Sequence, residues 1–463
     1  MQLKNNAGIV IIICLFIFAN LIFLRFYNDV WWDSSVYIGM GKHIFSSGQS
    51  GLWEPSRPLV LSVLLGAGWA LDFNVVYFGR FVSLVFSILT IFMVYSIGVK
   101  IFSKKTALLA SFFTAFSHTF IFFSPNILTE IPSTFFMLLA IYFFFNKRFF
   151  LIGLFIGISV MTRLFQSFIL IGLALAFFIH FHGKTDFSKK LIYTIIGISL
   201  TVVPYALLNY YMYHDVLMPF KVQAHLTKIT GWVHYSNYLF YIKGMFMENF
   251  FIVFLFAIPL FFKRSHKSLA LLLIPLFYII IFSIVKQKEM RHMFVVLPYL
   301  YLLASYSLIQ VYNKIKFKRL ALALFSLMLL VWVSMTFAFL NDAILYQSQK
   351  NDESFAYFQN YIKNSKETIW VTSPLYSLYS DAKISGLLYF YSSDNLIDFI
   401  NKNKNDAGII LYNNCDIPCP PIELDNSCAE SREILDKELS AFRKIYEKRQ
   451  NSCKYSIYER PSS

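Results

Sequence analysis

The sequence predicts an α-helical polytopic membrane protein with a small extracytoplasmic α/β domain at its C-terminal end. Hydrophobic residues make up 57% of the 463 residues, phenylalanine occurs 52 times, and the mean hydropathy is positive. One soluble core of this length cannot bury so much apolar surface. Apolar runs long enough to cross a bilayer recur between residues 8 and 340, and the composition becomes mixed and polar after residue 340.

Short polar or basic connections separate the apolar runs, which predicts about eleven transmembrane helices. The predicted segments are 8–26, 78–99, 106–123, 131–145, 149–162, 165–181, 190–212, 248–262, 268–285, 292–312 and 319–340. The neighbouring segments 149–162 and 165–181 are short, and one long tilted helix is the alternative for this pair.

Basic residues are concentrated in the connections that share one side of the membrane if the N-terminus is cytoplasmic. They are Lys100, Lys104, Lys105, Lys147, Arg148, Lys184, Lys189, Lys190, Lys263, Arg264, Lys267, Lys314, Lys316, Lys318 and Arg319. Joining the two short segments would move some of these clusters outside, so two helices are expected. The net charge of +15 then mostly reflects the basic residues of the cytoplasmic connections, and no nucleic-acid binding is expected from it.

The first apolar run has an alternative, a cleaved signal peptide with Lys4 as its charged end. The run is long for a signal peptide, and no convincing small-residue cleavage site follows it. A retained helix is therefore expected. The predicted transmembrane domain is 1–340, in a multi-pass protein of the plasma membrane.

Residues 341–463 are predicted to form an extracytoplasmic α/β domain. Strands are expected at ETIWVTSP, AGIILYN and CKYSIYER, and helices at NLIDFINKNK and SREILDKELSAFRKIYEKRQ. No catalytic motif is present in this domain. It is expected to recognise an acceptor, to pack over a site near the membrane, or simply to act as a stabilising cap.

Four of the five cysteines lie in this domain, namely Cys415, Cys419, Cys428 and Cys453. An even set in an exported domain predicts two disulfides, with the pairing left open. A zinc site is the alternative, but the spacing lacks paired CxxC motifs. Oxidation outside the cytoplasm agrees with the charge distribution.

The first outer loop, 27–77, is too apolar to be a free loop. VYIGMGKHIF and RPLVLSVLLGAGWAL are each long enough for a helix at the interface, and tryptophans favour that zone. Asp33 follows two tryptophans at the start of the loop. An ordered loop that lies on the membrane and carries a carboxylate is expected to roof a site.

Three further positions on the outer side place charges close to the hydrocarbon, where they are costly unless paired or used. They are Glu130 in SPNILTEIPS, Arg163 in VMTRLFQS, and the set Lys286, Lys288, Glu289, Arg291 and His292 in VKQKEMRHM. Each has a structural alternative. The lysines can snorkel at a helix end, Glu130 can interact with a helix N-terminus, and Arg163 can pair with a structural acid.

Several of these motifs occur together in known enzymes. DSSVYIGMGKHIFSSG, the later RPL, FGRFVSLVFSILTIFMVYSIGVKIFSKKTALLASFF, LTEIPSTFFMLLAIYFF and MTR follow one another along the chain. This order resembles the membrane glycosyltransferases of the GT-C fold, above all the protein O-mannosyltransferase and aminoarabinose transferase branch, glycosyltransferase family 39. KQKEMRHMFVVLPYLYLLAS is also similar to a segment of polyprenyl-phosphate-mannose-dependent mannosyltransferases. The resemblance covers about residues 8–312.

The resemblance implies roles for individual residues. Asp33 matches the acid at the reaction centre, and Glu130 matches the acid of the second outer loop, which would position the acceptor or orient Arg163. Many relatives have a second acid directly after the first. Ser34 stands there in this chain, so a second acid comes from elsewhere or is dispensable. The positions implied near the donor phosphate are Arg163, Lys286, Lys288, Arg291 and His292, and loop support is expected from Tyr37, Arg57 and Glu289.

These residue types suit sugar transfer from a polyprenyl-phosphate donor, because the leaving group is already present in the substrate. A carboxylate in a partly desolvated roof, with a raised pKa, can deprotonate an acceptor as a general base. Arginines can bind the departing phosphate through bidentate hydrogen bonds. Direct displacement inverts the anomeric centre and needs one base. A hexose such as mannose is expected as the sugar, and a glycan, lipid or protein as the acceptor.

Other classes fit the sequence less well. No Gly-rich phosphate loop, DxD cluster or HExxH motif is present, which disfavours a nucleotide-sugar donor. No cofactor is expected. A divalent metal is not excluded, because an ion could bind Asp33, Glu130 and His292, but these residues lack a clear ligand spacing. A polyprenyl-linked sugar transporter or flippase is the main alternative, although no internal repeat is found. A noncatalytic scaffold would leave Asp33 without a role.

Overall fold

The computed structural model describes residues 6–183, 186–229, 237–258, 266–285, 288–346, 353–363, 365, 367–388, 400, 406–416, 427–450 and 453–460. By the packing of its Cα atoms the chain divides into two units. The helical unit comprises Met1–Asn28, Arg80–Val216 and Tyr235–Gln347, and the mixed unit comprises Asp29–Gly79, Leu217–His234 and Ser348–Ser463. The predicted domain boundary at residue 340 stays a prediction.

Apolar helices of different lengths build the helical unit. They are α1 (Ala7–Phe26), α4 (Val75–Ile101), α5 (Lys104–Phe116), α6 (His118–Phe123), α7 (Glu130–Phe145), α8 (Phe149–Thr162), α9 (Ile169–Phe181), α10 (Phe187–Tyr213), α12 (Phe240–Glu248), α14 (His266–Ile284), α15 (Leu297–Lys314) and α16 (Lys318–Leu345). Three 3₁₀ helices join them, η2 (Leu164–Phe168), η4 (Phe250–Ala257) and η5 (Met290–Val295).

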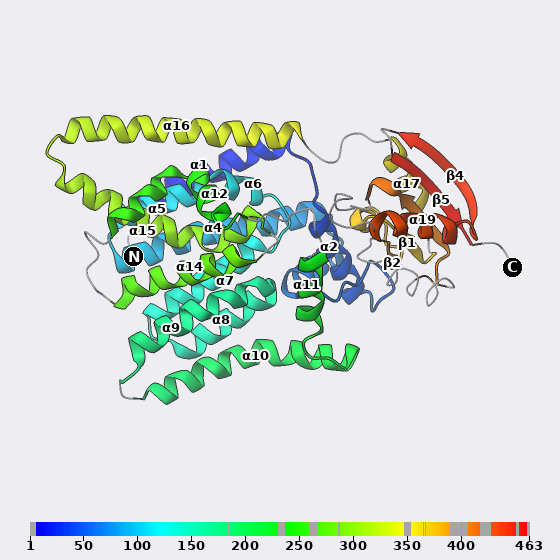
Figure 1. Cartoon of the computed structure of the whole chain (residues 1–463), viewed down its shortest axis with the longest axis horizontal. Helices are drawn as coiled ribbons and strands as arrows, with labels where there is room; N and C mark the ends of the chain where they lie inside the picture. The colour runs from blue at the N-terminus through cyan, green and yellow to red at the C-terminus, as the bar shows by residue number, and fades with distance from the viewer. Residues whose placement is uncertain are drawn as a thin grey trace. The chain divides into compact units, whose positions relative to one another are not determined.

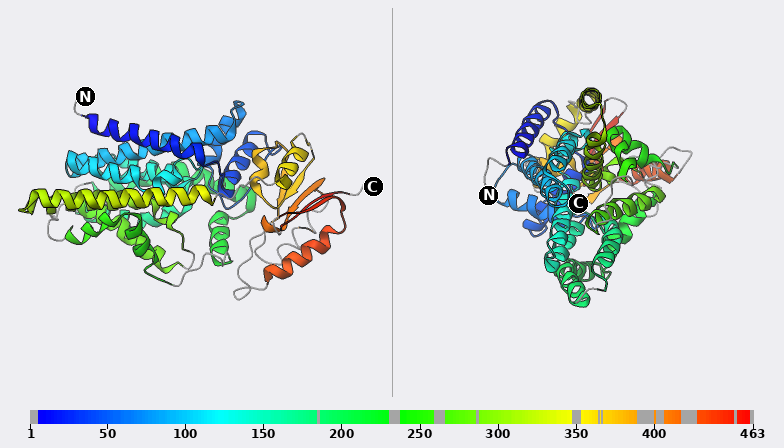
Figure 2. Two further views of the ribbon diagram at one scale, coloured as in Figure 1. Left: turned by 90° about the horizontal axis from the view of Figure 1, so that it is seen from above. Right: turned by 90° about the vertical axis from the view of Figure 1, so that its left-hand side faces the viewer.

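Close helix packing shapes this unit. Helix α8 lies between α7 and α10, and α9 packs on α14 (Figure 1). A Cβ atom added at Gly153 would lie 1.9 Å from the carbonyl oxygen of Thr194, so α8 and α10 can approach this closely only because Gly153 has no side chain. Helices α1 and α16 run roughly along a common direction (Figure 2).

Each of the eleven predicted segments overlaps at least one helix of the structure. Among the described residues, five helices are long and apolar enough to cross a membrane, or six if one bent pair counts as a span. Several of the other helices are apolar but shorter than a span. The chain is therefore a multi-pass membrane protein, as expected from its composition.

The predicted break between 149–162 and 165–181 is confirmed. Helix α8 ends at Thr162, and Arg163 is extended with φ −150° before η2 and α9 begin. One long tilted helix, the alternative for this pair, is wrong. Because the helix is interrupted here, the charged side chain of Arg163 can face other polar groups.

Two predicted continuous spans are broken instead. Within 106–123 the chain is extended at Ser117, between α5 and α6. Within 248–262, α12 and η4 meet at an angle of 110° around Asn249, whose side chain accepts a hydrogen bond from the Phe251 N–H at 3.0 Å. A side-chain cap of this kind competes with the continuing helix, and a hydropathy pattern does not contain it.

The mixed unit contains a five-stranded sheet with the order β2-β1-β3-β5-β4 (Figure 1). The strands are β1 (Ile369–Val371), β2 (Ile384–Leu387), β3 (Ile409–Asn413), β4 (Arg443–Gln450) and β5 (Cys453–Glu459). Strand β1 is parallel to β2 and β3, and β5 is antiparallel to β3 and β4. The three predicted strands are confirmed as β1, β3 and β5.

Helices cover both faces of this sheet because its side chains alternate. Ile369 and Val371 join a core that includes α17 (Glu353–Ile362), whereas Trp370 joins a second core that includes α19 (Ser427–Leu439). The first core also contains residues of the first outer loop.

The predicted helix 431–450 is wrong in its second half. Helix α19 ends at Leu439, and residues 443–450 form β4, which pairs with β5 from Arg443 to Gln450. Most side chains of β4 are exposed, as suits a strand at the edge of the sheet, and pairing with β5 overrides the helical pattern. The predicted helix at NLIDFINKNK lies mostly outside the described residues.

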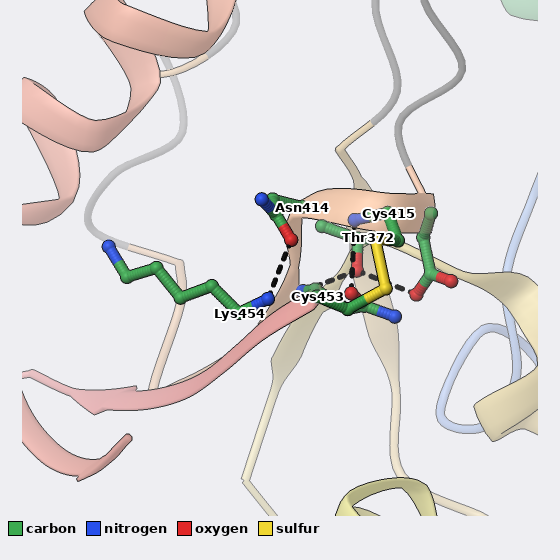
Figure 3. Close-up of a disulfide and its surroundings, with 7 residues drawn as sticks. Thr372, Asn414, Cys415, Cys453 and Lys454 are labelled. Carbon is green, nitrogen blue, oxygen red and sulfur yellow. Dashed lines mark hydrogen bonds between the residues drawn. A yellow bond between two sulfur atoms is a disulfide. The ribbon is translucent and has the colours of Figure 1, made fainter. Parts of the chain in front are cut away.

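The predicted disulfide chemistry is confirmed for one pair. Cys415 and Cys453 are bonded, with Cα atoms 5.5 Å apart, and join the segment after β3 to the start of β5 (Figure 3). The Lys454 N–H donates to the Asn414 side chain at 2.7 Å next to the bond. Cys419 lies outside the described residues, as does the side chain of Cys428.

The first outer loop is ordered as predicted. It forms α2 (Trp32–Phe45) and α3 (Val60–Ala70), which pack against each other. A further helix, α11 (Met218–Ile229), also belongs to the mixed unit. The loop thus presents Asp33 from a helix and not from irregular chain.

Candidate active site

Asp33 lies in the first turn of α2, directly after Trp32. The N-terminal end of a helix carries partial positive charge, so it favours a carboxylate there. The Asp33 side chain is 17% exposed. It is therefore partly withdrawn from water and still reachable by a substrate.

Arg57 binds Asp33 and a second acid. Its Nη2 atom lies 2.7 Å from Asp33 Oδ1, and its Nε atom donates to Glu54 Oε1 at 3.0 Å. The Ser56 hydroxyl donates to the same Glu54 oxygen at 2.6 Å. One guanidinium thus holds two carboxylates, and Glu54 is the second acid that the sequence did not place beside Asp33.

The pairing changes the expected electrostatics of Asp33. Partial burial disfavours an ionised carboxylate, as the sequence argument assumed, but a guanidinium in contact acts in the opposite direction. The Arg57 charge also lies over the ring of Tyr37, 5.5 Å from its centroid. Tyr37 stands four residues after Asp33 on the same face of α2, so it supports Arg57 from that helix.

A second cluster of charges lies in the helical unit around Glu130. This residue begins α7, and its side chain is 1% exposed. Arg163 Nη1 lies 2.7 Å from Glu130 Oε1 and also donates a hydrogen bond to the Thr129 hydroxyl at 3.2 Å. Little water reaches the pair, because the Arg163 side chain is only 13% exposed.

Neighbouring polar groups fix the break that carries Arg163. The Gln166 amide donates to the Ser133 hydroxyl at 2.8 Å, and the Ser159 hydroxyl donates to the Ser133 carbonyl oxygen at 2.7 Å. These bonds join α8 and η2 to the first turns of α7. The guanidinium is therefore placed by elements on both sides of it.

Arg291 belongs to the same cluster. Its Nη1 atom lies 4.0 Å from Glu130 Oε1, and its guanidinium pairs with Glu289. Two arginines and two glutamates in this cluster cancel in formal charge. A phosphate bound here would share guanidinium N–H groups with the carboxylates, and each arginine has five such donors.

Lys288 and His292 lie close to this cluster but are used by the fold. Lys288 Nζ donates to the carbonyl oxygens of Ser283, at 3.0 Å, and of Val285, at the end of α14. His292 is buried beside the rings of Phe165 and Phe282. Lys286 lies outside the described residues.

Tyr241 is a residue of this cluster that the sequence analysis missed. Its hydroxyl lies 3.2 Å from His292 Nδ1 and accepts the Glu289 backbone N–H at 3.3 Å. No local pattern distinguishes Tyr241 from the many other aromatic residues of the membrane segments. Glu54, by contrast, had a usable signal, because it stands three residues before Arg57 in the turn EPSR.

No group of three or more histidine, cysteine, aspartate or glutamate side chains that could hold a metal ion occurs among the described residues. Asp33 and Glu130 are each paired with an arginine.

Known proteins resemble this chain in part of its sequence and in its fold. A family model described as dolichyl-phosphate-mannose-protein mannosyltransferase matches residues 56–208. ArnT from Cupriavidus metallidurans bound to undecaprenyl phosphate has a TM-score of 0.70 at 11% identity, over 98% of both chains. The chain has the GT-C fold. No curated protein matches it in sequence.

Other structures of the GT-C fold agree. The archaeal oligosaccharyltransferase AglB from Archaeoglobus fulgidus, in complex with an inhibitory peptide and a dolichol-phosphate, has a TM-score of 0.61 at 12% identity over 99% of this chain and 75% of its own. The arabinofuranosyltransferase AftD from Mycobacteria has a TM-score of 0.56 at 10% identity, over 99% and 42%. The fold expected from the motifs is thus confirmed.

Proposed function

We propose that this chain is an inverting glycosyltransferase. It transfers a sugar, expected to be a hexose such as mannose, from a polyprenyl-phosphate or dolichyl-phosphate donor to an acceptor at the outer face of the plasma membrane. The observation that carries the proposal is the partly buried carboxylate of Asp33, held by Arg57 in a chain with the GT-C fold. The lipids bound to ArnT and AglB support a lipid-linked donor.

In the proposed reaction Asp33 accepts the proton of an acceptor hydroxyl or amide. The acceptor atom forms a bond to the anomeric carbon while the bond from that carbon to the phosphate oxygen breaks. The polyprenyl phosphate leaves with the electron pair, and its negative charge increases. Cations that contact the phosphate therefore bind the transition state more strongly than the ground state.

Arg163 and Arg291 are proposed to bind the donor phosphate, with Glu130 holding their guanidinium groups in place. The dry surroundings of Glu130 support this role, because a charge interaction is stronger where water is excluded. The hydrogen bonds of Lys288 and the ring contacts of His292 favour a role for these two residues in supporting the elements around the phosphate site.

The test is sugar transfer by the purified full chain in lipid. Polyprenyl-phosphate mannose and glucose are offered with glycan, lipid and peptide acceptors, and wild type is compared with Asp33→Asn. We expect transfer to fall by about 10³-fold or more while donor binding is retained, because a general base and the orientation of its substrate are lost together.

Asp72→Asn is the matched control, since it makes the same chemical change at an exposed position of the same loop. Asp72 has a φ of 60°, a conformation that asparagine also adopts readily. Normal transfer by Asp33→Asn would refute the assigned base. Movement of labelled lipid between leaflets without any transfer would favour a flippase.

A further inference from the structure

One short segment of the C-terminal sequence, residues 377–382, anchors the helix that carries Asp33 near both of its ends. The Ser377 hydroxyl donates to the carbonyl oxygen of Ser35 at 2.9 Å, in the first turn of α2. Near the other end of α2, Lys42 Nζ lies 2.8 Å from Asp381 Oδ1 and 3.1 Å from the Ser380 carbonyl oxygen. Both contacts lie within the mixed unit.

The Lys42 contact differs from an ordinary surface ion pair. The Lys42 side chain is 4% exposed, and burial lowers the pKa of Lys42 while Asp381 opposes this shift. Asp381 also accepts the Trp69 indole N–H at 3.2 Å, which joins α3 to the same carboxylate. Without Asp381 a buried ammonium group would lose its counter-charge, which is costly.

Apolar packing and backbone pairing extend the contact. Val36 and Met40 of α2 are fully buried in one core with Phe358 of α17. The Gly51 N–H donates to the Ala382 carbonyl oxygen at 3.2 Å, so the loop continues along the edge of the sheet.

Gly51 is required at this point. Its φ is +72°, and a Cβ atom there would lie 2.1 Å from the carbonyl oxygen of Gly39. A side chain at position 51 would therefore be strained and would push the loop away from α2.

We propose that the C-terminal domain is a positioning element for Asp33, and that Ser377 and Asp381 are its positioning residues. This inference rests on the proposed role of Asp33 as general base. A displacement of about 1 Å can cost about 100-fold in rate, so a catalytic carboxylate must sit on a helix that cannot shift. The domain then has a role in the reaction without contributing a reacting group.

The experiment compares wild type with Asp381→Asn and Ser377→Ala in the full chain in lipid. Two quantities are measured, the steady-state kinetics of sugar transfer and the hydrogen exchange of the α2 amides. We expect kcat to fall at least about tenfold for Asp381→Asn with KM for the donor within about twofold, because orientation is lost and donor binding is not. Exchange in 32–45 should accelerate, and Asp381→Glu should restore part of the rate.

Glu353→Gln is the matched control. Glu353 forms an exposed ion pair with Lys448 at 2.7 Å in the same domain and does not contact α2 in any described pair. This variant should leave kcat and α2 exchange at the wild-type values. Ser377→Ala removes one hydrogen bond without leaving a buried charge, so it keeps the test valid if Asp381→Asn folds poorly.

The outcomes separate the two proposals. Wild-type kcat in Asp381→Asn and Ser377→Ala, or unchanged exchange of α2, would overturn the positioning role. A wild-type protein that transfers no sugar from any donor would overturn the proposed function instead. In that case faster α2 exchange in Asp381→Asn would still support the anchoring of α2, and unchanged exchange would refute it.

Discussion

Arg57 gives the clearest example of what a single side chain contributes here. Its planar guanidinium contacts Asp33 through Nη2 and Glu54 through Nε, so the two carboxylates are held by different nitrogens of one group. A lysine has one charged centre and cannot make both contacts in this geometry. The orientation of Asp33 therefore depends on the shape of the arginine as well as on its charge.

We expect Arg57→Lys to lower transfer by about 10-fold to 100-fold with a change in stability of less than about 1 kcal/mol. The charge is retained, but the simultaneous contact with Asp33 and Glu54 is lost. Steady-state kinetics and thermal unfolding of the full chain measure the two effects. Arg449→Lys, at an exposed position of β4, is the control, and equal activity of the two variants would contradict the bridging role.

At the scale of elements, broken helices place the charged groups of the helical unit. Arg163 stands at the extended residue between α8 and η2, and Glu130 opens α7. If α8 continued through Arg163, the side chain of Arg163 would point in the direction set by the helix. The break gives it a different direction. The buried pair between them is thus a consequence of two helix ends that meet.

Contacts of Glu459 hold three elements of the C-terminal domain together. The Tyr361 hydroxyl of α17 donates to Glu459 Oε1 at 2.5 Å, and Arg443 of β4 donates to Oε2 at 2.8 Å. These hydrogen bonds, the one from Tyr361 first, lower the pKa of Glu459 below its ordinary value of 4.5. The folded state therefore favours the ionised carboxylate.

This shift predicts how stability depends on pH. The stabilisation by Glu459 is fully present above pH 4.5 and is lost as pH falls through the lowered pKa of the folded state. Unfolding of the full chain is followed between pH 7 and pH 3. Over this range the free energy of unfolding should fall more for wild type than for Glu459→Gln. Glu433→Gln is the exposed control; a Glu459→Gln profile parallel to wild type would rule out the linkage.

At the scale of the whole molecule, segments far apart in the sequence share one core. The first outer loop packs with α17 and the sheet, although more than 300 residues separate Lys42 from Asp381. Loop and C-terminal domain are therefore expected to fold together. The GT-C fold of the whole chain agrees with structures that share only about a tenth of its residues.

The orientation of the chain in the membrane is predicted by its basic connections, with residue 105 in the cytoplasm and residue 440 outside. Cysteines introduced one at a time at Lys105 and Ser440, in a Cys14→Ser background, test this with a maleimide that does not cross membranes. Ser440→Cys should react in intact cells, and Lys105→Cys only after lysis. The parent without either new cysteine gives the background, and the reverse labelling pattern would show the opposite orientation.

The sequence alone determined the membrane class, the helical segments, the break before Arg163 and three of the five strands. These features depend on local apolarity, charge and alternation, which neighbouring residues carry. Asp33 was singled out in the same way, by a carboxylate beside interfacial tryptophans, and its catalytic role stays a proposal.

Only the tertiary structure decided which groups meet. The pairing of Asp33 with Arg57, the hydrogen bonds of Tyr241 near η5 and the ion pair between Lys42 and Asp381 are contacts that no local pattern encodes. The same holds for β4, where pairing with β5 overrode a helical pattern, and for the bend at Asn249. Long-range contacts select one arrangement among several that the local sequence allows, because burial and hydrogen bonding are settled only when distant segments pack.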